Sequence, residues 1–181
     1  MACIVLIGFM ASGKTTVGRA LSAIIGGTFV DTDTEVERRE GMPIPEIFER
    51  KGESLFRRLE TRVLRELMGS DITGHLIIAT GGGLPCTGDN ISFMNSRGIT
   101  VYLRSSIDEI MARVGRIRER PVFQRTPNRE GLVELLRKRE QFYTQAQVIV
   151  ENRNDMPPRN TAEKIAEILM NRYGIQRDKK V

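Results

Sequence analysis

The residues with the clearest chemical potential lie close to the N-terminus, in the stretch GFMASGKTT that begins at Gly8. Gly8, Gly13, Lys14 and Thr15 have the spacing of the phosphate-binding pattern G-x-x-x-x-G-K-[ST]. Glycine allows such a loop to curl with its backbone N–H groups pointing inward, toward anionic oxygens. The pattern predicts that Lys14 reaches the outer phosphates of a nucleotide and that the Thr15 hydroxyl binds Mg²⁺. A chance match in an ordinary turn is disfavoured, because the apolar run CIVLI precedes the loop and a helical pattern follows it.

Two carboxylates, those of Asp31 and Asp33, follow the second predicted strand and share a face if the backbone is still extended there. Phosphoryl transfer to an alcohol needs Mg²⁺ held in place and an acceptor hydroxyl oriented in line. One carboxylate can support the metal through water, and the other can take the hydroxyl proton. The alternative is a simple turn in which Asp33 or Thr34 caps the next helix. Beside a phosphate loop we favour the catalytic interpretation.

Arginines supply the complementary positive charge. Arg57 lies about 200° around a predicted helix from Leu55, outside its apolar stripe, and Arg139 lies late in a predicted helix over 129–145. The planar fork of a guanidinium holds a carboxylate better than an ammonium does. An arginine of the Arg-rich loop 115–130 could also neutralise the transferring phosphoryl group on closure. The alternative for each of these arginines is a solvated surface charge.

The composition is that of a globular protein with a basic surface. The chain has 181 residues, of which 40% are hydrophobic and 28% charged, and this length allows a single domain over 1–181. A net charge of +5 suits anionic partners, and the absence of Trp favours small anions over nucleic acid. Two cysteines without a CxxC pair predict free thiols in a reducing cytoplasm, and no segment approaches the roughly 20 apolar residues of a membrane helix.

Short apolar runs alternate with longer helical patterns along the chain. The predicted strands are residues 3–7, 28–30, 76–80, 99–103 and 147–151, and the predicted helices include 53–68, 106–114 with a capping box of Ser106 and Glu109, and a last helix preceded by Asn160. This alternation predicts a three-layer α/β domain with a mostly parallel sheet. Ligands bind at the carboxyl ends of such strands, where the phosphate loop, the Asp pair and the triplet Gly81, Gly82 and Gly83 would meet. The triplet would let a small ring approach the backbone, although a plain turn is the alternative.

Two further patterns are similar to those of switch GTPases, which share the phosphate loop. The stretch DITG, residues 71–74, matches D-x-x-G, and NRND, residues 152–155, approaches the guanine-reading N-K-x-D. DITG precedes the third predicted strand, whereas a switch aspartate follows it, and Arg153 stands where lysine is expected. Both patterns are therefore interpreted as coincidental. No Ser/His/Asp or Cys/His nucleophile set is visible, and the single histidine, His75, is predicted to be an incidental surface residue in a loop.

Taken together, these stretches resemble the shikimate kinase family, small P-loop kinases of the nucleoside-monophosphate-kinase-like fold. The resemblance extends from residue 3 to about 170 and rests on GFMASGKTT, FVDTDTEVE, GESLFRRLE, ATGGGLP, RERP and RKREQFYTQAQ, which occur in this order. It implies a five-stranded parallel sheet of order 2-3-1-4-5 with helices on both faces, a substrate-binding helical insertion at about 33–62 and a lid at about 115–126. It further implies a cytoplasmic monomer that uses ATP and Mg²⁺ to phosphorylate the 3-hydroxyl of shikimate in chorismate and aromatic amino acid biosynthesis.

The resemblance also implies a role for each candidate residue. Asp33 would contact the acceptor hydroxyl as the catalytic base, while Lys14 and Arg120 of the lid would meet the phosphates. Asp31 would support Mg²⁺ beside Thr15, and Arg57 and Arg139 would grip the acceptor carboxylate. The nucleotide-binding residues would be Ala11, Ser12, Gly13, Lys14, Thr15, Thr16, Arg113 near adenine, Arg120 and Arg159. The acceptor-binding residues would be Asp33, Arg57, Gly81, Gly82, Gly83 and Arg139.

Several departures from the family pattern concern affinity more than chemistry. Ala11 replaces a glycine common in the phosphate loop, and we expect binding to survive if the φ of Ala11 stays negative. RPVF replaces R-P-L-L in the lid, and REQFY, with Glu140 beside Arg139, replaces R-x-P-L-Y. The segment 151–160 is longer than usual, which bears on the placement of Arg159.

Two other functions stay open at this level. Another small hydroxy-acid kinase of the same fold, such as a gluconate kinase, would use the same pair of arginines for its acceptor. A nucleotide-controlled binding module would bind nucleotide without turnover that an acceptor stimulates. The pair Asp31 and Asp33 at the sheet edge argues against the binding module.

Overall fold

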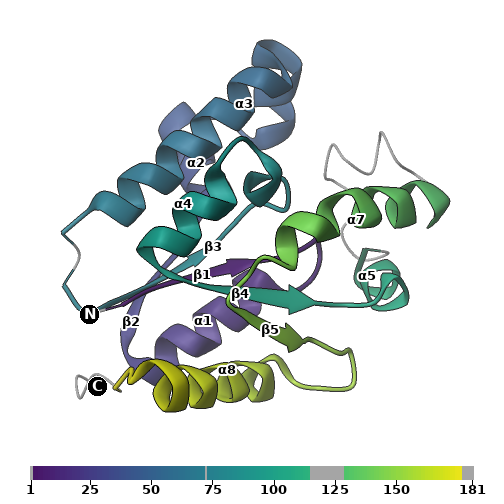
Figure 1. Cartoon of the computed structure of the whole chain (residues 1–181). Helices are drawn as coiled ribbons and strands as arrows, with labels where there is room; N and C mark the ends of the chain where they lie inside the picture. Colours follow the sequence, from purple (N-terminus) through teal and green to yellow (C-terminus); the bar gives the residue numbers. More distant parts are fainter. Residues whose placement is uncertain (1, 72, 115–128, 177–181) are drawn as a thin grey trace.

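A single parallel sheet forms the centre of the structure, which is a computed structural model that describes residues 2–71, 73–114 and 129–176. Its strands are β1 (Cys3–Ile7), β2 (Gly27–Asp31), β3 (His75–Ala79), β4 (Ile99–Arg104) and β5 (Val148–Glu151). All neighbouring strands pair in parallel, in the order β2-β3-β1-β4-β5 (Figure 1). The order expected from the resemblance is therefore confirmed, and each strand agrees with its predicted bounds to within one residue. The predicted lid, 115–126, lies outside the described residues.

Helices cover both faces of this sheet. The helices are α1 (Lys14–Ile25), α2 (Thr32–Glu40), α3 (Ile44–Gly69), the short 3₁₀ helix η1 (Leu84–Cys86), α4 (Asn90–Arg97), α5 (Ile107–Val114), α7 (Arg129–Tyr143) and α8 (Pro158–Tyr173). Figure 1 shows α1 and α8 on one side of the sheet and α3, α4 and α7 on the other. The predicted three-layer architecture is thus confirmed.

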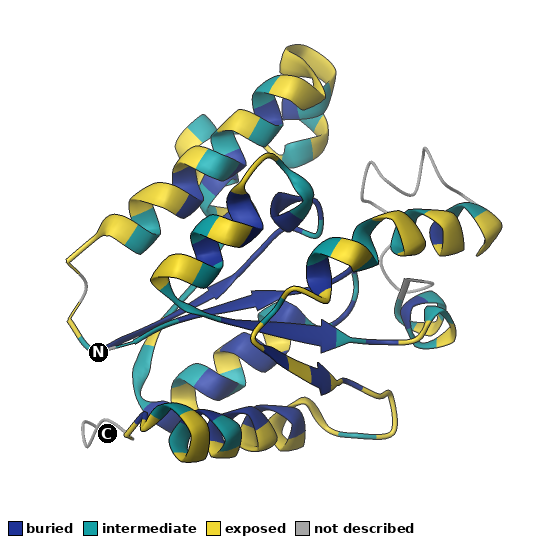
Figure 2. Cartoon of the chain, in the orientation of Figure 1, coloured by how far each residue is buried: buried dark blue, intermediate teal, exposed yellow. Residues whose placement is uncertain are grey.

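The two faces of the central strand explain why its sequence is apolar throughout. Successive side chains of a strand point to opposite faces. Ile4 and Leu6 of β1 join the core beneath α1 and α8, whereas Val5 and Ile7 join the core on the opposite face. Because both faces are covered, four consecutive residues of β1 are fully buried, and β1, β3 and β4 are mostly dark blue in Figure 2.

The segment between β2 and β3 carries its own small core. Val36 of α2 packs with Ile47, Phe56 and Val63 of α3. Within α3 the backbone breaks at Gly52, where φ is 78° and ψ is 163°, a conformation that favours glycine. The sequence predicted the helix after this break, and the structure extends it backward to Ile44. Helices α2 and α3 therefore form a wall beside the carboxyl ends of β2 and β3.

Three local expectations can be compared with the structure. The capping box is confirmed, since Ser106 N–H donates to Glu109 Oε2 at 2.7 Å and Glu109 N–H donates to Ser106 Oγ at 3.3 Å. The helix predicted after Asn160 begins earlier, at Pro158, because proline suits the first helical position. The prediction for His75 was wrong: it is a buried residue of β3, and Nε2 lies 2.9 Å from the carbonyl oxygen of Gln176. Across the described ranges, no helix is both long enough and apolar enough to span a bilayer.

Candidate active site

The phosphate loop joins β1 to α1 and curls around the Lys14 side chain. Gly13 adopts the left-handed conformation, with φ 90° and ψ 12°, and the helix begins at the next residue. Lys14 Nζ donates to the carbonyl oxygens of Gly8 at 2.9 Å and Phe9 at 2.7 Å. The ammonium group therefore lies inside the loop, where the motif places it for contact with phosphate oxygens.

The condition set for Ala11 is not met in the structure. Binding was expected to survive if its φ stayed negative, but φ is 57°, and Ala11 is the one non-glycine residue of the described chain with positive φ. A left-handed L-residue costs roughly 1–2 kcal/mol because Cβ approaches a carbonyl oxygen. The Ala11 carbonyl accepts a hydrogen bond from Arg113 Nη1 at 3.1 Å, which helps to hold this conformation. The loop is therefore contacted at this position by a side chain from outside it.

Thr15 and Asp31 meet where the first turn of α1 faces the end of β2. Thr15 Oγ1 donates to Asp31 Oδ2 at 2.7 Å, while Asp31 Oδ1 accepts from Asp33 N–H at 3.0 Å. Asp31, rather than Asp33 or Thr34, is thus the residue that caps α2. Hydroxyl and carboxylate oxygens are the ligands that Mg²⁺ prefers, and Mg²⁺ keeps several waters and substrate phosphates in its shell. The pair therefore fits the metal role predicted for it.

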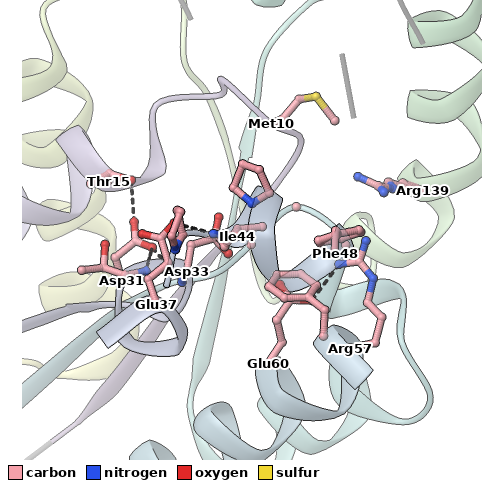
Figure 3. A pocket seen from close by; sticks show the side chains of 17 residues that line it. Met10, Thr15, Asp31, Asp33, Glu37, Ile44, Phe48, Arg57, Glu60 and Arg139 are labelled. Atoms are coloured by element: carbon pink, nitrogen blue, oxygen red, sulfur yellow. Dashed lines mark hydrogen bonds and ion pairs between the residues drawn. The ribbon is translucent and has the colours of Figure 1, made fainter. Parts of the chain in front are cut away.

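A cavity of about 470 Å³ extends from this pair to the two arginines expected to hold the acceptor. It is lined by Met10, Thr15, Asp31, Asp33, Thr34, Glu37, Pro43, Ile44, Pro45, Phe48, Phe56, Arg57, Glu60, Gly81, Gly82, Gly83 and Arg139. Figure 3 shows Asp31 and Asp33 on one side of the cavity and the guanidinium groups of Arg57 and Arg139 on the other. The structure therefore brings every predicted acceptor residue into one cavity, although they come from four separate parts of the chain.

Arg57 is held in the cavity wall by two carboxylates and two rings. Its Nη1 donates to Glu60 Oε2 at 2.7 Å and its Nη2 donates to Glu53 Oε1 at 3.1 Å. The guanidinium also lies over the rings of Phe56 and Phe48, 5.3 Å and 6.0 Å from their centroids. Burial tends to lower the pKa of Arg57, but Glu60 and Glu53 outweigh it, so the pKa is raised. Arg57 therefore stays a cation with a fixed orientation.

Glu60 is the most buried charged group of this wall. It is 1% exposed, and burial raises its pKa to about 7, with Arg57 acting in the opposite direction and Asp33 adding to the rise. Its Oε1 has no hydrogen-bond partner among the described residues. One oxygen of Glu60 pairs with Arg57, and the other lies on the Asp33 side. Near neutral pH, both the charged and the neutral form of this carboxyl group are therefore populated.

The two outer glycines of the triplet lie very close to charged side chains of the site. A Cβ at Gly81 would lie 2.5 Å from Asp33 Oδ1 and in hard contact with Glu60 Oε1, and a Cβ at Gly83 would lie 2.5 Å from Arg57 Nη1. The φ of Gly83 is −90°, which any residue adopts. The two flanking glycines therefore make room for the charged side chains of the site itself. The segment is also a hydrogen-bonded turn, in which Leu84 N–H donates to the Gly81 carbonyl at 3.1 Å, so the turn and the close approach occur together.

Arg139 approaches the triplet from α7. Its guanidinium lies 5.8 Å from the centroid of the Phe9 ring, and its Nη1 would lie 3.5 Å from a Cβ at Gly82. One turn later on the same helix, Tyr143 donates from its hydroxyl to the Gly82 carbonyl at 2.5 Å. Tyr143 is fully buried, so this bond fixes the triplet and α7 relative to each other.

The remaining predicted nucleotide residues divide into two groups. Ser12 and Thr16 lie in the loop and the first turn of α1, and Arg113 lies beside the loop. Burial lowers the pKa of Arg113, and its Nε donates to Asn154 Oδ1 at 2.6 Å. Arg159, by contrast, has a side chain that is 79% exposed and pairs with Glu163 at 3.0 Å. Nothing in this geometry brings Arg159 to the loop, and its nucleotide role remains a prediction. Arg120 lies outside the described residues.

Sequence reasoning missed three residues that shape the site. Glu60 had a signal, because it follows Arg57 by three positions on one helix and such pairs meet. Tyr143 lies one helical turn beyond Arg139, which is a similar but weaker signal. Asn152 bonds the Ser12 carbonyl from the loop after β5. It begins the stretch NRND, which was interpreted as coincidental, and its partner is 140 residues away.

Comparison with known proteins agrees with this geometry. The model of the shikimate kinase family matches residues 10–170 of the chain. A shikimate kinase of Nitrosospira multiformis is 41% identical over 166 residues, which cover 92% of this chain and 84% of the relative. One of Aquifex aeolicus is 39% identical over 171 residues, covering 94% of this chain and 96% of the relative. A solved structure of shikimate kinase from Acinetobacter baumannii in complex with shikimate has a TM-score of 0.87 and 38% identity, covering 94% of this chain and 93% of that one. The chain therefore belongs to the shikimate kinase family.

Proposed function

We propose that this protein is a shikimate kinase, which transfers the γ-phosphoryl group of ATP to the 3-hydroxyl group of shikimate. The reaction is a step of chorismate and aromatic amino acid biosynthesis. The observation that carries the proposal is the cavity that has Thr15 and Asp31 at one side and Arg57 and Arg139 at the other. A phosphate donor and an anionic alcohol can meet in it, and the relative solved with shikimate supports the choice of alcohol.

The charges of the cavity assign a part to each residue. Arg57 and Arg139 bind the carboxylate of shikimate through charge-assisted hydrogen bonds, which orients the ring. Asp33 takes the proton of the 3-hydroxyl while the hydroxyl oxygen attacks the γ-phosphorus and the bond to the ADP oxygen breaks. Lys14 and the backbone N–H groups of the loop stabilise the charge on the phosphates. Because both substrates are held in one cavity, the reaction becomes effectively unimolecular.

We propose Mg²⁺ as the metal of this site, bound by the Thr15 hydroxyl and supported by Asp31. The 2.7 Å contact between these two groups supports the assignment, since a metal bridging to phosphate needs hard oxygen ligands close to the loop. When bound, Mg²⁺ would neutralise the β- and γ-phosphate oxygens as charge moves to ADP. Asp31 would orient the metal-bound waters while it caps α2.

Release of ADP from MgATP by the purified protein tests the function, with shikimate and gluconate as separate acceptors. We expect release that depends on shikimate, with little from gluconate, because the relative solved with shikimate is 38% identical to this chain and shares its fold. Turnover with gluconate and none with shikimate would refute the proposal in favour of another hydroxy-acid kinase. Tight ADP binding without turnover on either acceptor would identify a nucleotide-controlled binding module instead.

We also propose that the protein acts as a cytoplasmic monomer without a nucleic-acid partner. Composition supports the absence of a nucleic-acid partner. The net charge of +5 accompanies 6% aromatic residues and no Trp, which is a poor platform for stacking bases. Light scattering should give a mass near the 20.4 kDa of one chain. A mass near twice that value, or retention on immobilised single-stranded DNA at physiological salt, would contradict these two points respectively.

A further inference from the structure

Two side chains from distant parts of the chain, Arg113 and Asn152, bind the outer side of the phosphate loop. Arg113 Nη1 donates to the Ala11 carbonyl at 3.1 Å, and Asn152 Nδ2 donates to the Ser12 carbonyl at 2.6 Å. Asn152 lies in the loop between β5 and α8 (Figure 1). Two consecutive carbonyls of the loop, those of Ala11 and Ser12, are thus held from outside.

Asn152 is fixed through all of its polar groups. Its N–H donates to the Arg104 carbonyl at 2.7 Å, and its own carbonyl accepts from Ser105 Oγ at 2.8 Å and from Arg113 Nη2 at 2.9 Å. Its Oδ1 accepts from Thr161 Oγ1 at 2.8 Å. The residue is 4% exposed, so none of these bonds competes freely with water. The orientation of the side-chain amide is settled as well, because the Ser12 carbonyl can only accept and must therefore face Nδ2.

The side-chain amide of Asn152 also packs closely against the loop at Gly13. A Cβ at Gly13 would lie 2.7 Å from Asn152 Nδ2, so the second glycine of the motif makes room for this side chain as well as for its own left-handed backbone. Ala11, two residues earlier, holds a left-handed conformation that an alanine does not prefer. Without contacts from outside, such a loop would sample other conformations.

We propose that Asn152 is a positioning residue for the nucleotide: it holds the phosphate loop in its phosphate-binding shape before the nucleotide arrives. The inference rests on the proposed function only in that the loop binds ATP and ADP. A loop that is already in the competent conformation binds with its full intrinsic affinity, whereas a loop that is competent a tenth of the time binds tenfold more weakly. Asn152 therefore contributes to nucleotide affinity without contact with the nucleotide.

Calorimetric titration of the Asn152→Ala variant with MgADP and, separately, with shikimate tests this inference. We expect the dissociation constant of MgADP to rise about tenfold, because the loop loses its bond to the Ser12 carbonyl. The dissociation constant of shikimate in the absence of nucleotide should change less than twofold. Asn90→Ala is the matched control: Asn90 is also fully buried, and its Nδ2 donates to Thr61 Oγ1 and the Leu84 carbonyl, away from the phosphate loop. It should lower the melting temperature and leave the MgADP constant unchanged.

The inference is overturned if Asn152→Ala is folded and binds MgADP within twofold of the wild type, since Asn152 would then be merely structural. Equal losses of MgADP and shikimate affinity would overturn it as well. If the alanine variant does not fold, Asn152→Ser keeps a polar group for Thr161 but is too short to reach the Ser12 carbonyl, and the same titration applies. Wild-type protein that binds no MgADP would contradict the proposed function itself, a result separate from the ratio between variant and wild type.

Discussion

Arg57 and Glu60 form a buried ion pair in the wall of the acceptor cavity, with Arg57 Nη1 donating to Glu60 Oε2 at 2.7 Å. The guanidinium that we assign to the acceptor carboxylate is therefore held from behind by a carboxylate that is almost inaccessible to water. Such a pair leaves the remaining donors of the planar fork directed along fixed lines. We therefore expect binding of the acceptor to depend on Glu60 through the orientation of Arg57.

Replacement of Glu60 by Gln should weaken binding of the acceptor and not of the nucleotide. Gln retains the size of Glu but removes the charge that orients Arg57, and a hydrogen bond to a charged group is worth about 1.5–3 kcal/mol. At pH 8, where Glu60 is charged, we expect the KM of shikimate to rise about tenfold, with the KM of ATP unchanged in steady-state kinetics. Glu53→Gln is the control, because Glu53 binds the same guanidinium from an exposed position, where a pair contributes about 0–1 kcal/mol. Equal effects of the two variants would contradict the importance of burial.

The same carboxyl group should make stability depend on pH. The pKa of Glu60 is raised from 4.5 to about 7 by burial, so between these values the folded protein binds a proton that the unfolded chain does not. The stabilising contribution of the protonated group is fully present below pH 4.5 and is lost as pH rises through 7, at up to about 1.4 kcal/mol per pH unit. Urea unfolding of wild type and Glu60→Gln at pH 5, 6, 7 and 8 should show a wild-type free energy of unfolding that falls relative to the variant. A difference that is constant across this range would be evidence against the raised pKa.

Arg139→Ala should raise the KM of shikimate by roughly 10- to 100-fold, because the carboxylate loses one of its two charge-assisted contacts. The KM of ATP should change little, since Arg139 lies on the acceptor side of the cavity. Arg137→Ala offers a control on the same helix at an exposed position, and it should behave as the wild type. Unchanged acceptor affinity in Arg139→Ala would remove this residue from the site.

Asp33→Asn should retain nucleotide binding and lose most turnover. General-base catalysis typically contributes about 10²–10⁴-fold, and asparagine cannot take the hydroxyl proton. The measurement is kcat with saturating substrates, together with calorimetric titration of MgADP to show that the loop is intact. A kcat within a few-fold of the wild type would exclude Asp33 as the base.

Gly83→Ala should displace Arg57, because a Cβ at this position would lie 2.5 Å from Arg57 Nη1. We expect the KM of shikimate to rise at least as much as in Glu60→Gln, while the melting temperature falls by a few degrees. Gly69→Ala is the control: a Cβ at this last residue of α3 meets nothing within 4 Å. It should leave kinetics unchanged and, by the helix propensity of alanine, stabilise slightly. A Gly83→Ala variant with a normal KM of shikimate would show that Arg57 can move aside without loss of acceptor binding.

Much of the fold and the site was predictable because their signals are local. The phosphate loop is a contiguous motif with its strand and helix at either side, and Asp31 and Asp33 follow directly from the end of β2. Parallel strands place their carboxyl ends along one edge, so the glycine triplet after β3 had to approach the phosphate loop. The family resemblance added the strand order and the pairing of Arg57 with Arg139, which no periodicity contains.

The remainder depends on contacts between distant parts of the chain. The positive φ of Ala11 could not be predicted, because residue type alone favours negative φ and the bond from Arg113 is invisible in the sequence. His75 was misplaced since its partner, Gln176, lies near the opposite end of the chain. The role of the glycine triplet in making room for Asp33, Glu60 and Arg57 needed coordinates, because a turn and a close approach have the same sequence.

The central claim is that the γ-phosphoryl group of ATP passes to the 3-hydroxyl of shikimate within the cavity that Asp33 lines. The most direct test is ¹H–³¹P correlation NMR of the product formed by the purified protein from MgATP and shikimate. The account predicts one new phosphomonoester whose phosphorus couples to the proton on C3, formed in equal amount with ADP. Formation of inorganic phosphate alone, or of a phosphomonoester at another hydroxyl, would contradict it.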